Sequence, residues 1–318
     1  MDPRLLIARS VSPQARASLE ALGAWVAALP ARPVPETLAD FDAGADRGAR
    51  GSEHLSRAAL EALAPEVTER TVGGVVALDV RPRNYRDDGS ALVYVHGGGF
   101  IEGSARSRLL TAALAASTSG RRVVSLDYTL APRGNWRTIL EQVVSAWAAL
   151  VDGTPAHRLG LIGDSAGGCI AAAASLLLRE RGLPSPGALV LLSPVTDLAG
   201  GGDTNVTLAP VDYLDERTLE VARRAYAPGA DLGHPLVSPV HGDFTPGFPP
   251  VLLQVGTREM LLSDSVRLHR ALRAAGQASR LELYEGMPHV FQPLLADTPE
   301  GQTAWAEISA FWTEHLRP

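Results

Sequence analysis

A serine nucleophile is the first chemistry that this sequence suggests. The stretch Gly163-Asp164-Ser165-Ala166-Gly167 follows an apolar run typical of a buried strand and precedes a long apolar helical run. Glycines on both sides of the serine allow a sharp turn that leaves its hydroxyl exposed. A glycine-rich turn with an incidental serine is the alternative, so the assignment needs partners elsewhere in the chain.

A general base is expected close to the C-terminus. His289 follows the last strand-like run and lies in the turn Gly286-Met287-Pro288-His289. The remaining seven of the eight histidines are less well placed, because they lie in helical or loop stretches or lack a tight turn after a strand. In the chain order serine, acid, histidine, the last member belongs in this part of the sequence. We therefore predict that His289 accepts the proton of Ser165.

The acid is expected directly after the strand-like run Val251–Val255. The loop that follows offers Glu259, four residues past the end of this run. Asp264 is the main rival. The apolar periodicity that begins at Leu262 indicates that Asp264 already lies on the next helix, about a turn further away. We predict Glu259 as the acid that orients His289, a role that glutamate fills in this chain order.

Backbone donors for an oxyanion are expected after another strand-like run. His96 is followed by three successive glycines, which let peptide N–H groups approach a reacting carbonyl oxygen. The residue after the nucleophile supplies a further donor. We predict Gly97, Gly98 and Ala166 as the donors, the alternative being a flexible loop at a strand end.

These motifs, taken together, resemble the hormone-sensitive lipase family, often called the family IV bacterial esterases. The resemblance runs from about Val75 to the C-terminus and holds in order and spacing. It rests on five stretches, which are His96-Gly97-Gly98-Gly99-Phe100, Asp127-Tyr128-Thr129-Leu130-Ala131-Pro132, Gly163-Asp164-Ser165-Ala166-Gly167-Gly168, Ser193-Pro194 with Asp197, and Gly286-Met287-Pro288-His289.

The resemblance implies an α/β-hydrolase fold, with a mostly parallel eight-stranded sheet, helices on both faces and a small helical cap. It implies that Ser165 attacks an acyl carbonyl, that an acyl-enzyme forms and that water releases the acid. One stretch departs from the family, which usually continues its Tyr-x-Leu-Ala-Pro motif with Glu-His-Pro-Phe-Pro. Here the sequence reads Arg133-Gly134-Asn135-Trp136-Arg137, which leaves the substrate open.

The order of elements agrees with this fold. From Val75 onward, short apolar runs alternate with longer helical stretches, which favours a mostly parallel sheet covered by helices. The expected strands are Val75–Val80, Leu92–His96, Val123–Asp127, Leu159–Gly163, Leu189–Ser193, Val251–Val255 and Leu281–Tyr284. The helix after Ser165 is expected to span Ala166–Arg181, since Gly182 and Pro184 follow it.

Two regions look different from this core. Residues 1–70 carry helical patterns at Ala15–Leu29 and Leu55–Leu63, separated by the Pro- and Gly-rich span Pro30–Gly51, and show no strand signal. An irregular insertion, residues 200–233, carries a helical pattern at Asp215–Tyr226. We expect both to form the cap, with the core in residues 71–199 and 234–318.

Composition excludes several other classes of protein. The 318 residues are 46% hydrophobic and 20% charged, with a net charge of −6, so a folded chain is expected and nucleic acid is not an expected partner. No lysine occurs, which rules out Schiff-base chemistry and the usual P-loop. Cys169 is the only cysteine, so no intramolecular disulfide forms.

Cofactors and location follow the same reasoning. The histidines show no paired spacing for metal ligands and no HExxH motif occurs, so neither a metal nor another cofactor is expected. The apolar start Leu5–Ala8 is too short for a signal peptide, and the longest nearly apolar run, Cys169–Leu178, is too short for a membrane span. We expect a cytoplasmic protein; a homodimer is left open.

Three functions remain in competition. The first is a carboxylic-ester hydrolase acting on a small-molecule acyl ester of short or medium chain length. The second is a specialised deacetylase or acyltransferase, because an amine or alcohol can intercept the same acyl-enzyme and the same residues can cleave an acetyl amide. The third is a non-catalytic small-molecule receptor on the same scaffold, which the presence of His289 disfavours.

Overall fold

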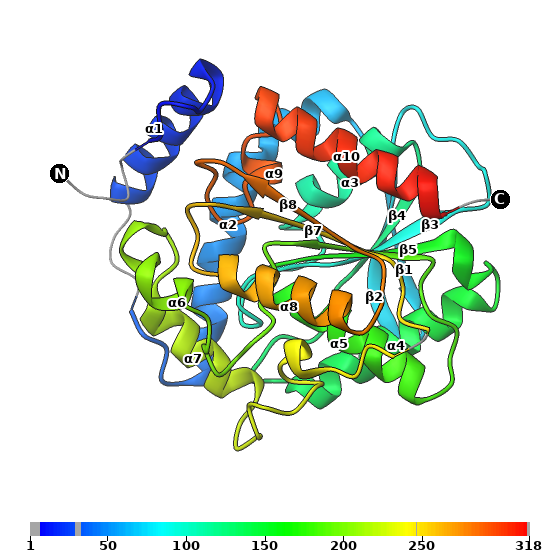
Figure 1. The fold of residues 1–318 in the computed structure, drawn as a ribbon. Helices are drawn as coiled ribbons and strands as arrows, with labels where there is room; N and C mark the ends of the chain where they lie inside the picture. The colour runs from blue at the N-terminus through cyan, green and yellow to red at the C-terminus, as the bar shows by residue number, and fades with distance from the viewer. Residues whose placement is uncertain (1–6, 29–32, 246, 317–318) are drawn as a thin grey trace.

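An eight-stranded sheet runs through the molecule in the computed structural model, which describes residues 7–28, 33–245 and 247–316 (Figure 1). The strand order is β1-β2-β4-β3-β5-β6-β7-β8. Strand β2 pairs antiparallel with both of its neighbours, and every other pair in the sheet is parallel. The expected mostly parallel, eight-stranded sheet is confirmed.

The strands agree closely with the sequence pattern. All of the expected strands are present, with ends that differ by at most two residues. The observed strands are β1 (Glu66–Val72), β2 (Val75–Arg81), β3 (Ala91–Val95), β4 (Arg122–Leu126), β5 (Leu159–Asp164), β6 (Ala188–Leu192), β7 (Val251–Gly256) and β8 (Ser279–Tyr284). Every residue of β3, β5, β6 and β7 is buried, as required of strands covered on both faces.

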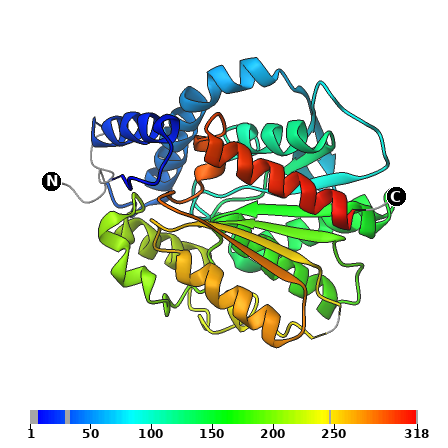
Figure 2. The same cartoon turned by 45° about the horizontal axis from the view of Figure 1, so that its top comes forward.

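Helices cover both faces of the sheet, and two separate apolar cores form beneath them (Figures 1 and 2). Helices α3 and α10 pack on one face, and α4, α5 and α8 on the other. The helices are α1 (Pro13–Ala28), α2 (Leu38–Leu63), α3 (Leu109–Ser119), α4 (Trp136–Val151), α5 (Ala166–Glu180), α6 (Thr204–Thr207), α7 (Glu216–Tyr226), α8 (Leu262–Ala274), α9 (Phe291–Leu294) and α10 (Pro299–His315).

The long helix α2 corrects one expectation from the sequence. Its first half, from Leu38 onward, occupies most of the span that was expected to be a loop. Thr37 and Asp40 form a reciprocal capping box that starts the helix. One of the glycines that hide the helical pattern lies close to a side chain, because a Cβ at Gly48 would lie 2.6 Å from the Glu102 carboxylate.

Strand β1 is a second correction, because no strand was expected before Val75. Its residues are mostly polar, and it lies at the edge of the sheet, so it lacks the apolar run of a central strand. The signal that was available is the Gly73-Gly74 pair, a two-residue hairpin turn that joins β1 to β2. The sheet therefore begins at Glu66, inside residues 1–70, where no strand was expected.

The N-terminal helices and the insertion after β6 lie at one end of the sheet. Helices α1, α2, α6 and α7 are on the left in Figure 1, on the side where the parallel strands end. The expected insertion helix is present as α7, with Asp215 as its N-cap. Tyr226 of α7 stacks on Phe100, with ring centroids 3.8 Å apart, so this helix packs against the loop that follows β3.

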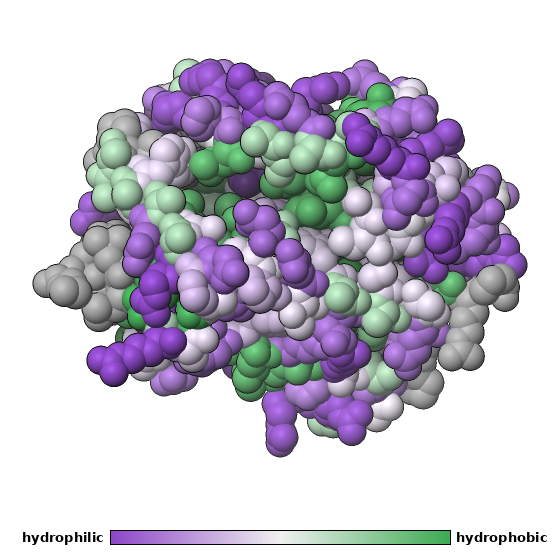
Figure 3. Space-filling view, turned by 90° about the horizontal axis from the view of Figure 1, so that it is seen from above, coloured by the Kyte–Doolittle hydropathy of each residue, from purple (hydrophilic) through white to green (hydrophobic). Residues whose placement is uncertain are grey.

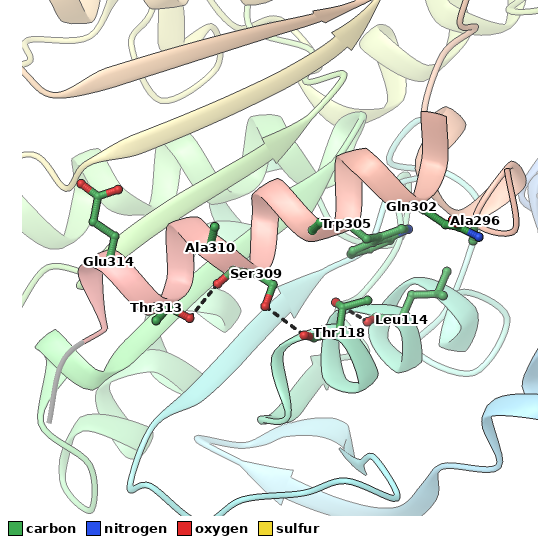
Figure 4. A pocket seen from close by; sticks show the side chains of 10 residues that line it. Leu114, Thr118, Ala296, Gln302, Trp305, Ser309, Ala310, Thr313 and Glu314 are labelled. Carbon is green, nitrogen blue, oxygen red and sulfur yellow. Dashed lines mark hydrogen bonds between the residues drawn. The ribbon is translucent and has the colours of Figure 1, made fainter. Parts of the chain in front are cut away.

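A cleft of about 800 Å³ opens between α3 and α10 (Figures 3 and 4). Figure 3 looks down on this face and shows a hollow with hydrophobic walls. Leu114 and Trp305 line it, and Ser309 donates a hydrogen bond to the Thr118 carbonyl at 2.9 Å (Figure 4). None of the site residues expected from the sequence lines this cleft.

Within the described residues, no helix combines the length and the apolar character that a membrane crossing requires.

The contact between β5 and α10 leads to a stability prediction. A Cβ at Gly160 would lie 2.6 Å from the Trp312 ring and 2.8 Å from the Leu92 side chain, which are both fully buried. Gly160→Ala should therefore lower the free energy of unfolding by about 1–3 kcal/mol through overpacking. Urea unfolding followed by circular dichroism measures this change.

Gly153→Ala is the matched control. A Cβ at Gly153 would meet no atom within 4 Å, so this variant should unfold at nearly the wild-type urea concentration. Equal midpoints for the two variants would show that the contact between Gly160 and Trp312 has room for a methyl group.

Candidate active site

The ends of three parallel strands bring the predicted nucleophile, acid and base together. Ser165 follows β5, Glu259 follows β7 and His289 follows β8. These strands run in the same direction in adjoining parts of the sheet, so the loops at their carboxyl ends meet at one edge. Residues separated by 124 positions in the chain thus lie in direct contact.

Ser165 occupies a strained turn between β5 and α5. Its backbone has φ 52° and ψ −120°, a region that residues with a Cβ rarely adopt. The flanking glycines are required by close packing, since a Cβ at Gly163 would lie 2.3 Å from the Gly167 carbonyl and one at Gly167 2.1 Å from the Val95 carbonyl. The turn directs the Ser165 hydroxyl away from the sheet and toward the loop after β8.

A continuous hydrogen-bonded chain links the three side chains. His289 Nε2 lies 2.9 Å from Ser165 Oγ, and His289 Nδ1 lies 2.7 Å from Glu259 Oε2. The Glu259 carboxylate accepts a hydrogen from Nδ1, which leaves Nε2 free to accept the serine proton. His289 is 3% exposed and Glu259 is fully buried, so water does not compete for the contact between them, whereas Ser165 is half-buried.

The Glu259 carboxylate is also fixed from its other side. Its Oε1 atom accepts hydrogen bonds from the Ser193 hydroxyl and from the Gly256 N–H, both at 2.7 Å. A buried carboxylate is stable only when its oxygens have such partners. Its orientation toward His289 is therefore set by the end of β7 and by the residue that follows β6.

The electrostatics of the site favour a basic imidazole. Burial lowers the pKa of His289, but the hydrogen bond and charge of Glu259, together with the charges of Asp212 and Asp164, outweigh that effect. The pKa of His289 therefore lies above its ordinary value. Glu259 acts most strongly because it is in direct contact with the ring.

Asp264, the rival acid, points elsewhere. It lies on α8, as expected, and its Oδ1 atom accepts hydrogen bonds from the backbone N–H groups of Thr196 and Asp197 at 2.7 and 2.9 Å. Burial raises its pKa to about 6. It tethers the loop after β6 to α8 and makes no hydrogen bond to His289 among the described contacts.

The glycine loop after β3 approaches Ser165, but one of its N–H groups is already engaged. Gly97 N–H donates to Asp164 Oδ1 at 3.0 Å, which removes Gly97 from the free donors. Gly98 and Gly99 have positive φ angles of 123° and 59°, and among the described residues no acceptor binds their N–H groups. The free N–H groups of this loop are therefore those of Gly98 and Gly99, whereas the sequence predicted those of Gly97 and Gly98.

Two buried side chains hold the glycine loop in place. Asp164 accepts hydrogen bonds from Gly97 N–H and from the Tyr94 hydroxyl, the latter at 2.6 Å. His96 is fully buried, burial lowers its pKa to about 4, and its Nδ1 lies 2.8 Å from the Gly97 carbonyl. The neutral ring therefore donates from Nδ1 to that carbonyl and stacks on Tyr128.

Ser193 is a functional candidate that the sequence reasoning did not assign. Its hydroxyl donates to Glu259 and accepts the N–H of Val290 at 3.0 Å, so it bridges the loops that carry Glu259 and His289. Its backbone has a positive φ of 46°. The Ser193-Pro194 pair at a strand end was the signal available in the sequence, but its spacing gives no indication of the bridge.

The divergent stretch Arg133–Arg137 is turned toward neighbouring helices. Arg133 forms an ion pair with Asp42 of α2 at 2.7 Å, and Asn135 caps the N-terminus of α4. Trp136 is buried against His234, with Arg137 stacked 4.0 Å from its ring centre. Among the described residues, no hydrogen bond joins these side chains to Ser165, Glu259 or His289.

In the described part of the chain, no group of three or more His, Cys, Asp or Glu side chains has the arrangement of a metal site.

Comparison with protein families gives one match over most of the chain. Residues 92–293 match a family described as having the alpha/beta hydrolase fold. The matched region includes the glycine loop, the turn at Ser165, the acid loop and His289.

Individual relatives agree with the family match. An acetyl-hydrolase of Streptomyces hygroscopicus is 38% identical over 76% of this chain and 80% of its own length. An ethyl acetate hydrolase of Pseudomonas putida is 30% identical over 72% of this chain and 74% of its own length. A solved esterase from the bacterial hormone-sensitive lipase family is 32% identical, with a TM-score of 0.84, and the alignment covers 96% of this chain and 99% of the other.

The contrast between Glu259 and Asp264 can be tested by titration. Glu259→Gln removes the charge in contact with the imidazole and should lower the pKa of His289, because burial then acts with less opposition. It should also slow the reaction of Ser165 with a fluorophosphonate. Proton NMR titration of His289 and the labelling rate measure the two effects.

Asp264→Asn serves as the comparison variant, since asparagine retains an acceptor for the Thr196 and Asp197 N–H groups. The pKa of His289 and the labelling rate should change far less than in Glu259→Gln. The opposite ranking of the two variants would assign the acid to Asp264.

Proposed function

This chain belongs to the hormone-sensitive lipase-like family of the α/β-hydrolase fold, and we propose that it is a serine hydrolase of carboxylic esters that works through an acyl-enzyme. The observation that carries the proposal is the hydrogen-bonded chain from Ser165 through His289 to Glu259. This arrangement supports nucleophilic attack by a serine whose proton passes to a positioned imidazole.

In the proposed mechanism, Ser165 Oγ attacks the ester carbonyl carbon while His289 Nε2 takes its proton. The tetrahedral intermediate collapses when the protonated imidazole gives that proton to the leaving alcohol, and the acyl group remains on Ser165. Water then attacks the acyl-enzyme, with His289 again as base, and the acid is released. Glu259 stabilises the imidazolium in both steps.

The oxyanion would form close to the glycine loop. Gly98, Gly99 and Ala166 are the proposed donors, because Gly97 N–H is occupied by Asp164 and the Ala166 N–H is the first of helix α5. The N-terminal end of a helix has N–H groups without partners in the helix, which favours negative charge there. Gly97 then supports the loop by its contact with Asp164 instead of binding the oxyanion itself.

We propose that the predicted cap, residues 1–70 and 200–233, is formed in the described part of the chain by α1, α2 and the insertion after β6, without the residues from Glu66 onward that belong to β1. The support is the position of α2 and α7 at the end of the sheet where the strands finish (Figure 1). A Cβ at Gly99 would lie 3.7 Å from Ala222 of α7, so the cap reaches the glycine loop itself. Such a cap would enclose a confined pocket for a small acyl ester.

Short acyl groups fit this proposal. Two relatives are named as acetyl-hydrolase and ethyl acetate hydrolase, which are activities on two-carbon acyl groups. The same acyl-enzyme would also form from an acetyl amide, so a specialised deacetylase or acyltransferase is the second candidate, favoured by the name acetyl-hydrolase. A receptor without catalysis is disfavoured by the intact hydrogen-bonded chain at Ser165.

The identity of the nucleophile is directly testable. A fluorophosphonate should label Ser165 alone, and Ser165→Ala should lose nearly all hydrolysis of p-nitrophenyl acetate while keeping its fold, because only the nucleophile is removed. Mass spectrometry of the labelled peptide and circular dichroism of the variant provide the measurements. Labelling at another residue, or an active alanine variant, would overturn the mechanism.

Acyl-chain preference should peak below about ten carbons, because a small cap confines the pocket. A series of p-nitrophenyl esters from acetyl to palmitoyl gives kcat/KM for each chain length. The confined pocket would be refuted by highest activity on the palmitoyl ester or on emulsified substrate.

A further inference from the structure

The insertion after β6 reaches the loops that carry the acid and the base. Asp212 and Tyr213 directly follow the short helical turn Ala209–Val211. Asp212 is 2% exposed, while Tyr213 keeps 38% of its surface exposed. Both side chains make hydrogen bonds to backbone groups outside the insertion, at positions adjacent to the proposed triad.

Tyr213 fixes the peptide group that follows the base. Its hydroxyl donates to the His289 carbonyl at 2.6 Å. The N–H of the same peptide group, that of Val290, donates to the Ser193 hydroxyl at 3.0 Å. The peptide is thus held at both of its polar ends, one of them by the insertion.

That peptide needs such support because Val290 is in an unfavourable conformation. Its φ and ψ are both 48°, in the left-handed region that a β-branched residue rarely occupies. Strain of this kind persists only where the surroundings fix it. Without the Tyr213 hydrogen bond, the backbone at His289 would have fewer constraints, and the imidazole would be less well directed at Ser165 Oγ.

Asp212 acts in the same way on the acid loop. Its Oδ2 atom accepts the N–H of Met260, the residue after Glu259, at 2.6 Å. The Met260 carbonyl in turn accepts the hydroxyl of Thr204, another residue of the insertion, at 2.8 Å. Both polar groups of Met260 therefore bond to the insertion, and Glu259 is anchored on its C-terminal side.

We propose that Asp212 and Tyr213 are positioning residues, by which the cap insertion sets the geometry of the Glu259–His289 pair in addition to covering the site. This inference rests on the proposed function, since positioning matters only if His289 serves as the base. An insertion that merely covered the substrate would affect substrate binding. An insertion that holds Glu259 and His289 in place also affects the chemical step, and so kcat.

Tyr213→Phe tests the hydroxyl while keeping the ring. It should lower kcat for p-nitrophenyl acetate about tenfold, since small displacements of a catalytic group are costly, with KM within about twofold of wild type. Tyr226→Phe is the matched control in the same insertion. Among the described residues the Tyr226 hydroxyl has no hydrogen-bond partner, so its removal should leave kcat unchanged.

Asp212→Asn removes the charge and keeps one oxygen for the Met260 N–H, while the Leu214 N–H, which the other carboxylate oxygen accepts at 3.0 Å, loses its acceptor. The charged groups that act on the imidazole are Glu259, Asp212 and Asp164, and all three raise the pKa of His289. Neutral His289 is the active base, so kcat/KM rises with pH through that pKa. Loss of the Asp212 charge should move this rise to lower pH, whereas Tyr213→Phe changes no charge and should leave it in place.

A spectroscopic measurement makes the test independent of activity. The proton between His289 Nδ1 and Glu259 should give a far-downfield proton NMR resonance, which shifts or broadens in Tyr213→Phe and stays in place in Tyr226→Phe. If the wild type hydrolyses no ester, the proposed function fails. The positioning role is then tested by comparing this resonance in Tyr213→Phe and in Tyr226→Phe.

Three results would overturn the inference while the proposed function stands. They are an unchanged kcat and KM in Tyr213→Phe, a rise in KM alone in that variant, and equal losses of kcat in the two phenylalanine variants. Thermal unfolding of each variant shows whether any loss reflects a damaged fold.

Discussion

The buried hydrogen bond between Glu259 and His289 is the interaction that most of the site is built to support. A carboxylate without solvent is costly unless every strong acceptor position has a donor. Here the donors come from the ends of β6 and β7 and from the loop after β8. Three separate connections must therefore meet at one point, which a parallel sheet achieves because its strands all finish at the same edge.

Backbone strain is concentrated around that point. Within the described residues, the non-glycine positions with positive φ include Phe100, Ser165, Ser193 and Val290, which lie in the glycine loop, the nucleophile turn and the two loops beside the acid and base. The strain is compensated locally by the hydrogen bond that the Ser193 hydroxyl accepts from Val290 N–H and the one that Tyr213 donates to the His289 carbonyl, and by glycines that allow close backbone contact. The surrounding core is correspondingly regular, with central strands buried on both faces.

The parts of this arrangement that follow from local sequence could be predicted, and those that depend on distant contacts could not. The central strands and the turn at Ser165 have a clear apolar or glycine pattern. By contrast, the first half of α2 contains glycines that are poor in a helix, and among them only Gly48 has a close contact, with Glu102, that a Cβ would disturb. The engagement of Gly97 by Asp164 is equally invisible, because it depends on how the ends of two strands meet in space.

The two halves of the proposed cap are attached to the core in different ways. The α2 side includes an ion pair between Arg133 and Asp42, which are 59% and 53% exposed and therefore stabilise the attachment little. The insertion after β6 is attached by hydrogen bonds from Asp212 and Tyr213 to peptide groups adjoining the acid and base. Helix α2 also packs against the two apolar cores through Phe41, Leu60 and Leu63, so its movement would break apolar contacts but no hydrogen bond beside the acid or base. Movement of the insertion would also disturb the Glu259–His289 pair, so on the proposed mechanism opening of the cap should involve the N-terminal half more than the insertion.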